Sequence, residues 1–281
     1  MLTVLEIIKR STEFLAKHGV ENPRLNAEHL VGHALGLKRM QLYIQFERPL
    51  AEPELAKIRP LVKRRSEREP LQYIVGTADF AGVTLKVDRR ALIPRPETEL
   101  LVEFAQALCP EPPAAILDLG TGTGALALAL ARQFPAAKVT AVDVSREALA
   151  LAAENAATSA MAERVSFLES DWFAGLPGEA KFGLIVANPP YLSTAEVAET
   201  APEVRGFEPR GALTSGPTGL EALDVIIRGA KAHLNSGGWL LCETGIAQHA
   251  HLLALAQNAG FARVESRKDL TGRDRFVLAQ A

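Results

Sequence analysis

The chain has 281 residues, which exceeds one average domain and predicts a small domain beside a medium-sized one. Its hydrophobic fraction of 48% and charged fraction of 23% exclude a disordered chain, and its net charge of -2 excludes a protein that coats a polyanion. The two cysteines, Cys109 and Cys242, lie far apart in no metal-like spacing and indicate a reducing compartment, which we expect to be the cytoplasm.

Residues 1–70 are predicted to form a small helical domain. Thr3 and Glu6 have the spacing of a capping box, Asn22-Pro23 begins a second helix, and residues 52–69 form a third. The third helix is basic. Its basic side chains either face an acidic protein or RNA, or they form a solvent-exposed face whose charge is offset by nearby glutamates. Its basic residues are Lys57, Arg59, Lys63, Arg64, Arg65 and Arg68.

Residues 71–95 are predicted to be a β-hairpin linker. Two β-prone runs, 73–75 and 83–87, are separated by Gly76 and Gly82. The stretch 93–99 follows with two prolines that fix an extended loop, and the second of them suits the first turn of the next helix.

Residues 96–281 are predicted to be an α/β domain, because strand-like and helix-like segments alternate along them. This alternation is typical of a mostly parallel sheet with helices on both faces. The expected strands are 116–119, 139–142, 165–168, 184–187, 239–243, 264–267 and 275–279, and the expected helices are 125–133, 146–158, 220–234 and 249–259.

A glycine-rich loop between the first strand and its helix indicates a nucleoside-binding site. The loop is Gly120-Thr121-Gly122-Thr123-Gly124, where the backbone can approach a ligand closely. Asp143 ends the second strand, where its carboxylate can accept hydrogen bonds from ribose hydroxyls. Asp118, just before the glycines, suits a positively charged ligand such as the methionine part of S-adenosylmethionine and would repel a dinucleotide pyrophosphate.

Asp171 and Trp172 follow the third strand, at the edge of the sheet where ligands bind in such folds. The Asp171 carboxylate can accept a hydrogen bond from an adenine amino group, and the Trp172 indole can pack on a ring. For Trp172, packing in the core is an equally good interpretation.

The loop Asn188-Pro189-Pro190-Tyr191 follows the fourth strand, beside the predicted donor site. Its two prolines lock the backbone and leave carbonyl oxygens without local competition. If the Asn188 side-chain oxygen and the Pro189 carbonyl each accept one N–H, they orient a planar nitrogen for methyl transfer. Tyr191 is expected to form a wall against which a flat acceptor stacks.

These motifs resemble the HemK/PrmC family of protein-glutamine N5-methyltransferases, and the resemblance covers nearly the whole chain. Its most specific mark is Ile93-Pro94-Arg95-Pro96-Glu97-Thr98-Glu99, because Asn-Pro-Pro-Tyr alone also occurs in adenine and cytosine amino methyltransferases. Further matches are the stretches 70–76, 118–124, 207–210 and 268–275.

The resemblance implies a class I S-adenosylmethionine-dependent methyltransferase with a Rossmann-like, mostly parallel seven-stranded sheet. It implies that the chain methylates the glutamine of the Gly-Gly-Gln motif in class I peptide chain release factors, with S-adenosylhomocysteine as product. By this resemblance the donor contacts fall on Gly120–Gly124, Asp143, Trp172 and Asn188, and the substrate glutamine lies on Asn188–Tyr191. The helical domain is implied to bind the release factor.

Other functions are weighed against this one. Amino methylation of adenine or cytosine in nucleic acid predicts a strongly basic groove, which the near-neutral chain lacks, so no nucleic acid is required. A donor-binding protein without activity and a nicotinamide dehydrogenase are weaker alternatives. No metal is expected, because His29 and His33 share a helix face without a third ligand, and no membrane role follows from an apolar run as short as 125–131.

Overall fold

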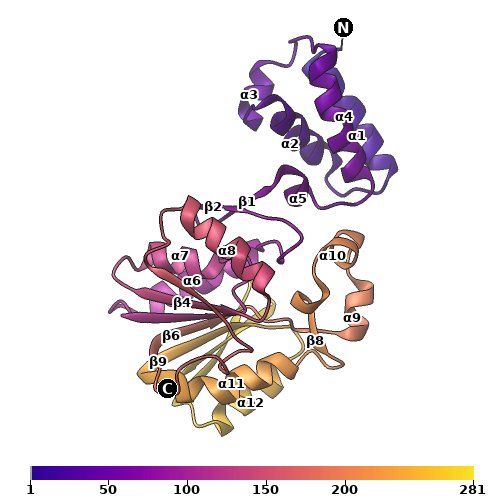
Figure 1. Cartoon of the computed structure of the whole chain (residues 1–281). Coiled ribbons are helices and arrows are strands. Elements are labelled where there is room, and N and C mark those ends of the chain that lie inside the picture. The colour runs from indigo at the N-terminus through magenta and orange to yellow at the C-terminus, as the bar shows by residue number, and fades with distance from the viewer. Residues whose placement is uncertain (1) are drawn as a thin grey trace. The chain divides into compact units, whose positions relative to one another are not determined.

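The computed structural model describes residues 2–281, which divide into two compact units. One unit comprises the described residues up to Gly76 together with Ala201–Phe207, and the other comprises Thr77–Thr200 and Glu208–Ala281 (Figure 1). Each unit has its own hydrophobic core.

The first unit is helical. Its helices are α1 (Val4–Lys17), α2 (Pro23–Leu35), α3 (Arg39–Ile44), α4 (Glu52–Ser66), α5 (Leu71–Val75) and α10 (Pro202–Phe207). The predicted capping box is confirmed, since Thr3 and Glu6 exchange hydrogen bonds between side chain and backbone at 2.8 and 3.3 Å. Helix α3 was not predicted from the sequence, because its six residues are too few to display helical periodicity.

The predicted strand at residues 73–75 is wrong, because these residues lie in helix α5. Tyr73 and Ile74 are β-prone, but both are buried in this unit, and Gly76 ends the helix in the left-handed conformation. Burial against neighbouring helices therefore overrides the local β propensity. The hairpin begins after this helix, with β1 (Thr77–Phe80) and β2 (Val83–Lys86) paired antiparallel around Ala81-Gly82.

Five basic side chains of helix α4 and the turn that follows it pair with glutamates of the same unit. Arg64 binds Glu69 at 2.7 Å, Lys63 lies 3.9 Å from Glu67, and Arg59 forms an ion pair with Glu52. Arg65 and Arg68 both bind Glu203 of α10, at 2.8 and 2.7 Å. These pairs favour the interpretation of α4 as a locally neutralised face over that of a surface for RNA.

The second unit is built on the predicted seven-stranded sheet, with strand order β10-β11-β9-β6-β3-β4-β5. Six strands run in the same direction, and β11 alone runs antiparallel to them, between β9 and β10. The strands are β3 (Ala115–Leu119), β4 (Lys138–Asp143), β5 (Val165–Glu169), β6 (Phe182–Ala187), β9 (Leu234–Glu243), β10 (Arg263–Lys268) and β11 (Asp274–Gln280). The expected class of fold is confirmed.

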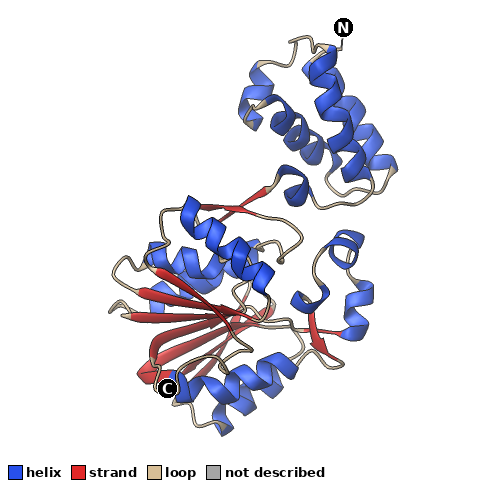
Figure 2. Cartoon of the chain, viewed as in Figure 1, coloured by secondary structure: helices blue, strands red, loops and turns tan. Residues whose placement is uncertain are grey.

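Helices cover both faces of this sheet, with α6, α7 and α8 on one face and α11 and α12 on the other (Figures 1 and 2). Their bounds are α6 (Glu99–Leu108), α7 (Ala125–Gln133), α8 (Arg146–Thr158), α11 (Glu221–His233) and α12 (His249–Asn258), and the 3-10 turn η1 (Pro96–Thr98) precedes α6. Central strand residues such as Leu117 and Ile185 are fully buried, as a sheet covered on both faces requires.

An excursion between β6 and α11 was not anticipated. It contains a short parallel pair, β7 (Leu192–Ser193) and β8 (Thr214–Gly216), with α9 (Thr194–Glu199), α10 and the 3-10 turn η2 (Arg210–Ala212) between them. Its elements are so short that no periodicity marks them in the sequence.

Candidate active site

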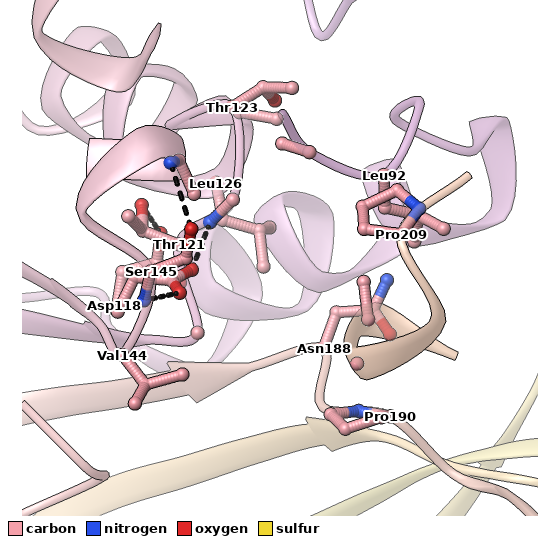
Figure 3. Close-up of a pocket in the computed structure, with 18 of the residues that line it drawn as sticks. Leu92, Asp118, Thr121, Thr123, Leu126, Val144, Ser145, Asn188, Pro190 and Pro209 are labelled. Carbon is pink, nitrogen blue, oxygen red and sulfur yellow. Dashed lines mark hydrogen bonds between the residues drawn. The ribbon is translucent and has the colours of Figure 1, made fainter. Parts of the chain in front are cut away.

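A cavity opens at the carboxyl ends of β3, β4 and β6. The order of the sheet changes direction at β3, which lies between β6 and β4, and such switch points are where open α/β sheets bind ligands. Figure 3 shows Asp118, Thr121 and Ser145 gathered on one side of the cavity and Asn188, Pro190 and Pro209 on the other.

Most of the residues predicted from the sequence meet in this cavity. Those that line it are Asp118, Gly120, Thr121, Gly122, Thr123, Asp143, Asp171, Trp172, Asn188 and Pro190. Among residues 2–281, the lining does not include Gly124, Pro189 or Tyr191. Gly124 instead allows α7 and α8 to approach, since a Cβ atom there would lie 3.1 Å from that of Ala152.

The glycine-rich loop turns its N–H groups toward the protein. Gly120 and Thr121 both donate to the Val142 carbonyl at 2.9 Å, and Gly122 donates to Asp143 Oδ2 at 2.9 Å. Gly124 donates to the Thr121 carbonyl at 2.8 Å. A loop that cradles phosphate needs such groups directed at its ligand, so this geometry disfavours the pyrophosphate of a nicotinamide cofactor.

Asp118 is a buried carboxylate with 1% of its surface exposed. Its Oδ2 atom accepts the Thr121 hydroxyl at 2.6 Å and the Ala127 N–H at 3.1 Å. Burial raises the pKa of Asp118 to about 7, the two donors oppose this rise, and the charge of Asp143 adds to it. A cationic ligand in the cavity would favour the ionised form of this carboxylate.

Asp143 lies at the end of β4, and its carboxylate is held by the backbone. Oδ2 accepts the Gly122 N–H, and Oδ1 accepts the Ser145 N–H at 2.9 Å. Burial raises its pKa, and these backbone donors oppose the rise. Each carboxylate oxygen can accept more than one hydrogen bond, so Asp143 keeps the capacity to bind ligand hydroxyls.

Trp172 lies between the cavity and the hydrophobic core of the second unit. Its ring lines the cavity and also packs on the core of the second unit. The ring lies against Gly120, where a Cβ atom would be 3.4 Å from it. The Ser170 hydroxyl fixes this loop by donating to the Trp172 carbonyl at 2.8 Å, and the neighbouring Asp171 is exposed at the cavity.

The Asn188 side chain is oriented by Thr98, a residue that was not selected from the sequence as a site residue. Asn188 Nδ2 donates to Thr98 Oγ1 at 3.1 Å, and Thr98 Oγ1 donates to Glu243 Oε2 at 2.6 Å. With Nδ2 bonded in this way, Oδ1 is the end of the Asn188 amide that remains for a ligand. The sequence signal for Thr98 was its place in the stretch 93–99.

Tyr191 is directed toward Glu243. Its hydroxyl donates to Glu243 Oε1 at 3.0 Å, and the Arg275 guanidinium lies 5.6 Å from the centre of its ring. Burial and the Glu243 charge raise the pKa of Tyr191, so its hydroxyl stays protonated and donates. Gln248 holds the loop from the other side by donating to the Tyr191 carbonyl at 2.8 Å.

Two further segments complete the cavity. Arg95 binds the buried Glu208 at 2.7 Å, which joins the loop before α6 to the loop that begins at residue 208. Asn155 fixes the β1–β2 hairpin to the glycine-rich loop by donating to the Lys86 and Thr123 carbonyls at 3.0 and 2.9 Å. The lining residues from these segments are Phe80, Arg90, Ala91, Leu92, Pro94, Pro209, Gly211 and Ala212.

The described residues meet the requirements of neither a metal site nor a membrane-spanning helix. Within residues 2–281, no group of three or more His, Cys, Asp or Glu side chains is arranged to hold a metal ion. In the same part of the chain, every helix is too short or too polar to traverse a bilayer.

Two protein-family models match the chain. The PrmC N-terminal domain matches residues 6–76, and the methyltransferase small domain matches residues 96–204. The first match ends where the helical N-terminal segment ends, and the second begins at the turn before α6.

Full-length relatives carry one common description. A release factor glutamine methyltransferase of Geobacter sulfurreducens is 44% identical over 275 residues, which cover 98% of this chain and 95% of the relative. One of Rhodopirellula baltica is 40% identical over 285 residues, covering 99% and 96%. Both alignments include the helical unit as well as the sheet.

Solved structures share the fold. The Thermus thermophilus 16S rRNA N2 G1207 methyltransferase, solved with AdoMet and guanosine, superposes with a TM-score of 0.53 at 24% identity. The match covers 73% of this chain and 49% of that one. At this identity the likeness establishes the methyltransferase fold alone.

Proposed function

Because this chain belongs to the release factor glutamine methyltransferase family, we propose that it transfers a methyl group from S-adenosylmethionine to the side-chain amide nitrogen N5 of a release factor glutamine. The glutamine is that of the Gly-Gly-Gln motif in class I peptide chain release factors, and the other product is S-adenosylhomocysteine. The observation that carries this proposal is the Asn188 amide, fixed by Thr98 at the edge of a cavity lined by carboxylates.

The carboxylates of the cavity suit this donor. Asp118, Asp143 and Asp171 all line the cavity, and a ligand with an ammonium group and a positively charged sulfur is attracted where a pyrophosphate is repelled. We assign the methionine end to the side of Asp118, the ribose to Asp143 and the adenine to Asp171 and Trp172. When bound, S-adenosylmethionine supplies a methyl group already activated by its sulfonium.

The residues on the acceptor side act on a poor nucleophile. An amide nitrogen has its lone pair delocalised into the carbonyl group, so it reacts only if it is aligned and if charge developing on it is stabilised. Asn188 Oδ1 and the Pro189 carbonyl each accept one N–H of the substrate amide in our proposal. Both acceptors belong to a loop that Gln248 holds, so little reorganisation is needed during transfer.

The rest of the chain supports a protein substrate. We assign the helical unit to binding of the release factor, and no nucleic acid is needed for that contact. Arg59, Arg64 and Arg65 of helix α4 are paired with glutamates of the helical unit, which is unfavourable for RNA binding. We propose the cytoplasm as the location of the activity, because the proposed substrate belongs to the translation apparatus.

The test is a methylation assay with labelled S-adenosylmethionine. The substrates are a release factor with Gly-Gly-Gln, the same factor with Gly-Gly-Ala, and duplex DNA. We expect label on the Gly-Gly-Gln factor alone, and mass spectrometry of the tryptic peptide should place one methyl group on the glutamine. Label on DNA, or equal labelling of the two factors, would refute the proposal.

A further inference from the structure

Glu243 is a buried carboxylate at the carboxyl end of β9, directly behind the acceptor loop. Only 1% of its surface is exposed, and its two oxygens are bound by two different hydroxyls. Oε2 accepts the Thr98 hydroxyl at 2.6 Å, and Oε1 accepts the Tyr191 hydroxyl at 3.0 Å. Burying a carboxylate costs free energy, so a buried carboxylate next to the acceptor loop points to a role for it there.

The direction of these hydrogen bonds determines how Asn188 lies. A hydroxyl has one proton, and the Thr98 proton is used on Glu243. Thr98 Oγ1 can therefore only accept a bond from Asn188, which forces Nδ2 rather than Oδ1 toward Thr98. The two ends of an asparagine amide are nearly equal in size, so a hydrogen-bonding partner of this kind is what distinguishes them.

We propose that Glu243 is a positioning residue that acts through Thr98 to keep the Asn188 side-chain oxygen facing the substrate amide. This inference rests on the proposed function for its effect on catalysis. If the amide were reversed, Asn188 would present N–H groups to the N–H groups of the substrate glutamine. Both sides would then be donors, and the grip on the reacting nitrogen would be lost.

The two accepting oxygens of Glu243 support this role. A carboxylate is an acceptor on both oxygens, whereas a glutamine in its place carries an amide group that donates. That group can donate to Thr98 and release the Thr98 proton to bind Asn188 Oδ1, which would reverse the amide. Burial raises the pKa of Glu243 and the charge of Glu97 adds to this rise, while the hydrogen bonds from Thr98 and Tyr191 and the charge of Arg275 oppose it.

The first part of the test compares steady-state kinetics and donor binding across matched variants of the full chain. Glu243→Gln and Thr98→Val should each lower kcat roughly tenfold or more while the Kd for S-adenosylmethionine, measured by calorimetry, changes less than about twofold. Thr98→Ser retains the hydroxyl and should restore most of the rate. In an Asn188→Ala background, Glu243→Gln should cost little further, because both changes disable the same group.

The second part measures the amide without requiring methyl transfer. In protein labelled with ¹⁵N at asparagine, the Asn188 NH₂ protons should show an Overhauser contact to Thr98, and Glu243→Gln should abolish it. An unchanged contact together with an unchanged kcat in Glu243→Gln would overturn the inference. A wild-type protein that does not methylate the release factor would refute the proposed function. If Glu243→Gln nevertheless abolishes the contact between Asn188 and Thr98, the orienting role of Glu243 stands.

Loss of folding in the Glu243→Gln variant is distinguished from loss of activity by the Thr98 variants. Should Glu243→Gln fold poorly, Thr98→Val and Thr98→Ser carry the test alone, since both are close in size to threonine. Equal rates in these two Thr98 variants would then contradict the inference.

Discussion

The Oδ2 atom of Asp118 accepts the backbone N–H of Ala127 at 3.1 Å, so the N-terminus of α7 is capped by a carboxylate of the protein itself. A helix N-terminus attracts anions because its first N–H groups are unpaired. Here one of those N–H groups, that of Ala127, is already bound by Asp118, and the Asp118 carboxylate brings negative charge to the site. The cavity is consequently arranged for a cation rather than for a phosphate.

Replacing Asp118 by asparagine should weaken donor binding. Asp118→Asn retains an oxygen that can accept the Ala127 N–H, but it removes the negative charge near the methionine end of the donor. We expect the Kd for S-adenosylmethionine to rise roughly tenfold in calorimetry. Asp118→Ala, which also removes the cap, should bind still more weakly, and an unchanged Kd in both variants would contradict our placement of the donor.

Donor binding should also depend on pH. Burial raises the pKa of Asp118 to about 7, so the carboxyl group is largely protonated below that pH and charged above it. Affinity for the cationic donor should therefore increase as the pH rises through about 7 and then level off, and Asp118→Asn should lack this rise. The effect on folding stability has the opposite sign. The contribution of Asp118 is fully present below the ordinary pKa of 3.8, is lost as the pH rises from there to about 7, and changes no further above it.

Removing the Asn188 side chain should impair transfer more than donor binding. Asn188→Ala eliminates one preorganised acceptor of the substrate N–H, and we expect kcat to fall roughly 10²-fold. The control is Asn258→Ala, since Asn258 is exposed at the end of α12 and should leave kcat unchanged. Turnover in Asn188→Ala equal to that of the control would sink the proposed role of Asn188.

Gly219 offers a test of the acceptor loop that leaves every polar side chain in place. A Cβ atom at Gly219 would lie 2.3 Å from the Tyr191 carbonyl oxygen, so Gly219→Ala must displace the loop. Gly237→Ala is the matched control, because Gly237 has a similar φ of +76° and open space around it. Backbone strain should cost both variants about 1 kcal/mol of stability in urea unfolding, and Gly219→Ala should lose more because it also displaces the loop. Only Gly219→Ala should also lose kcat.

The pairing of α10 with α4 should contribute to the stability of the helical unit. Glu203 accepts hydrogen bonds from Arg65 and Arg68, and Arg65 is almost fully buried. Glu203→Gln leaves these cations without a counter-charge, so we expect a loss of about 2 kcal/mol in urea unfolding. Glu199→Gln on the exposed end of α9 is the control and should be nearly neutral, and equal losses in the two variants would argue against the pairing.

Much of the fold was accessible from the sequence because its long elements are periodic. The helices at 125–133 and 146–158 were predicted with the bounds that the structure gives them, and all seven strands of the sheet were located. Helices α3 and α5 were not, because one is too short for periodicity and the other consists of β-prone residues held helical by packing.

Some contacts of the candidate site follow from local sequence, and others do not. Asp118 and Asp143 lie at the carboxyl ends of β3 and β4, and Asn188 follows β6 directly. The carboxyl ends of parallel strands converge, so the meeting of these residues in one cavity follows from local sequence. The partnership of Thr98 with Glu243 joins residues 145 positions apart, and no local pattern encodes it. The roles that we propose for the site residues stay predictions until the variants are measured.

The chain crosses between the two compact units after Gly76, after Thr200 and after Phe207. A protease cut in the hairpin region would therefore not release the helices, because the segment 201–207 remains joined to the sheet unit at both of its ends and is bound to Arg65 and Arg68. Removal of residues 1–76 would leave Glu203 without its two partners, Arg65 and Arg68. The helical unit thus depends on a segment that lies between the acceptor loop and α11, so replacing the unit as a whole requires replacing residues 201–207 as well.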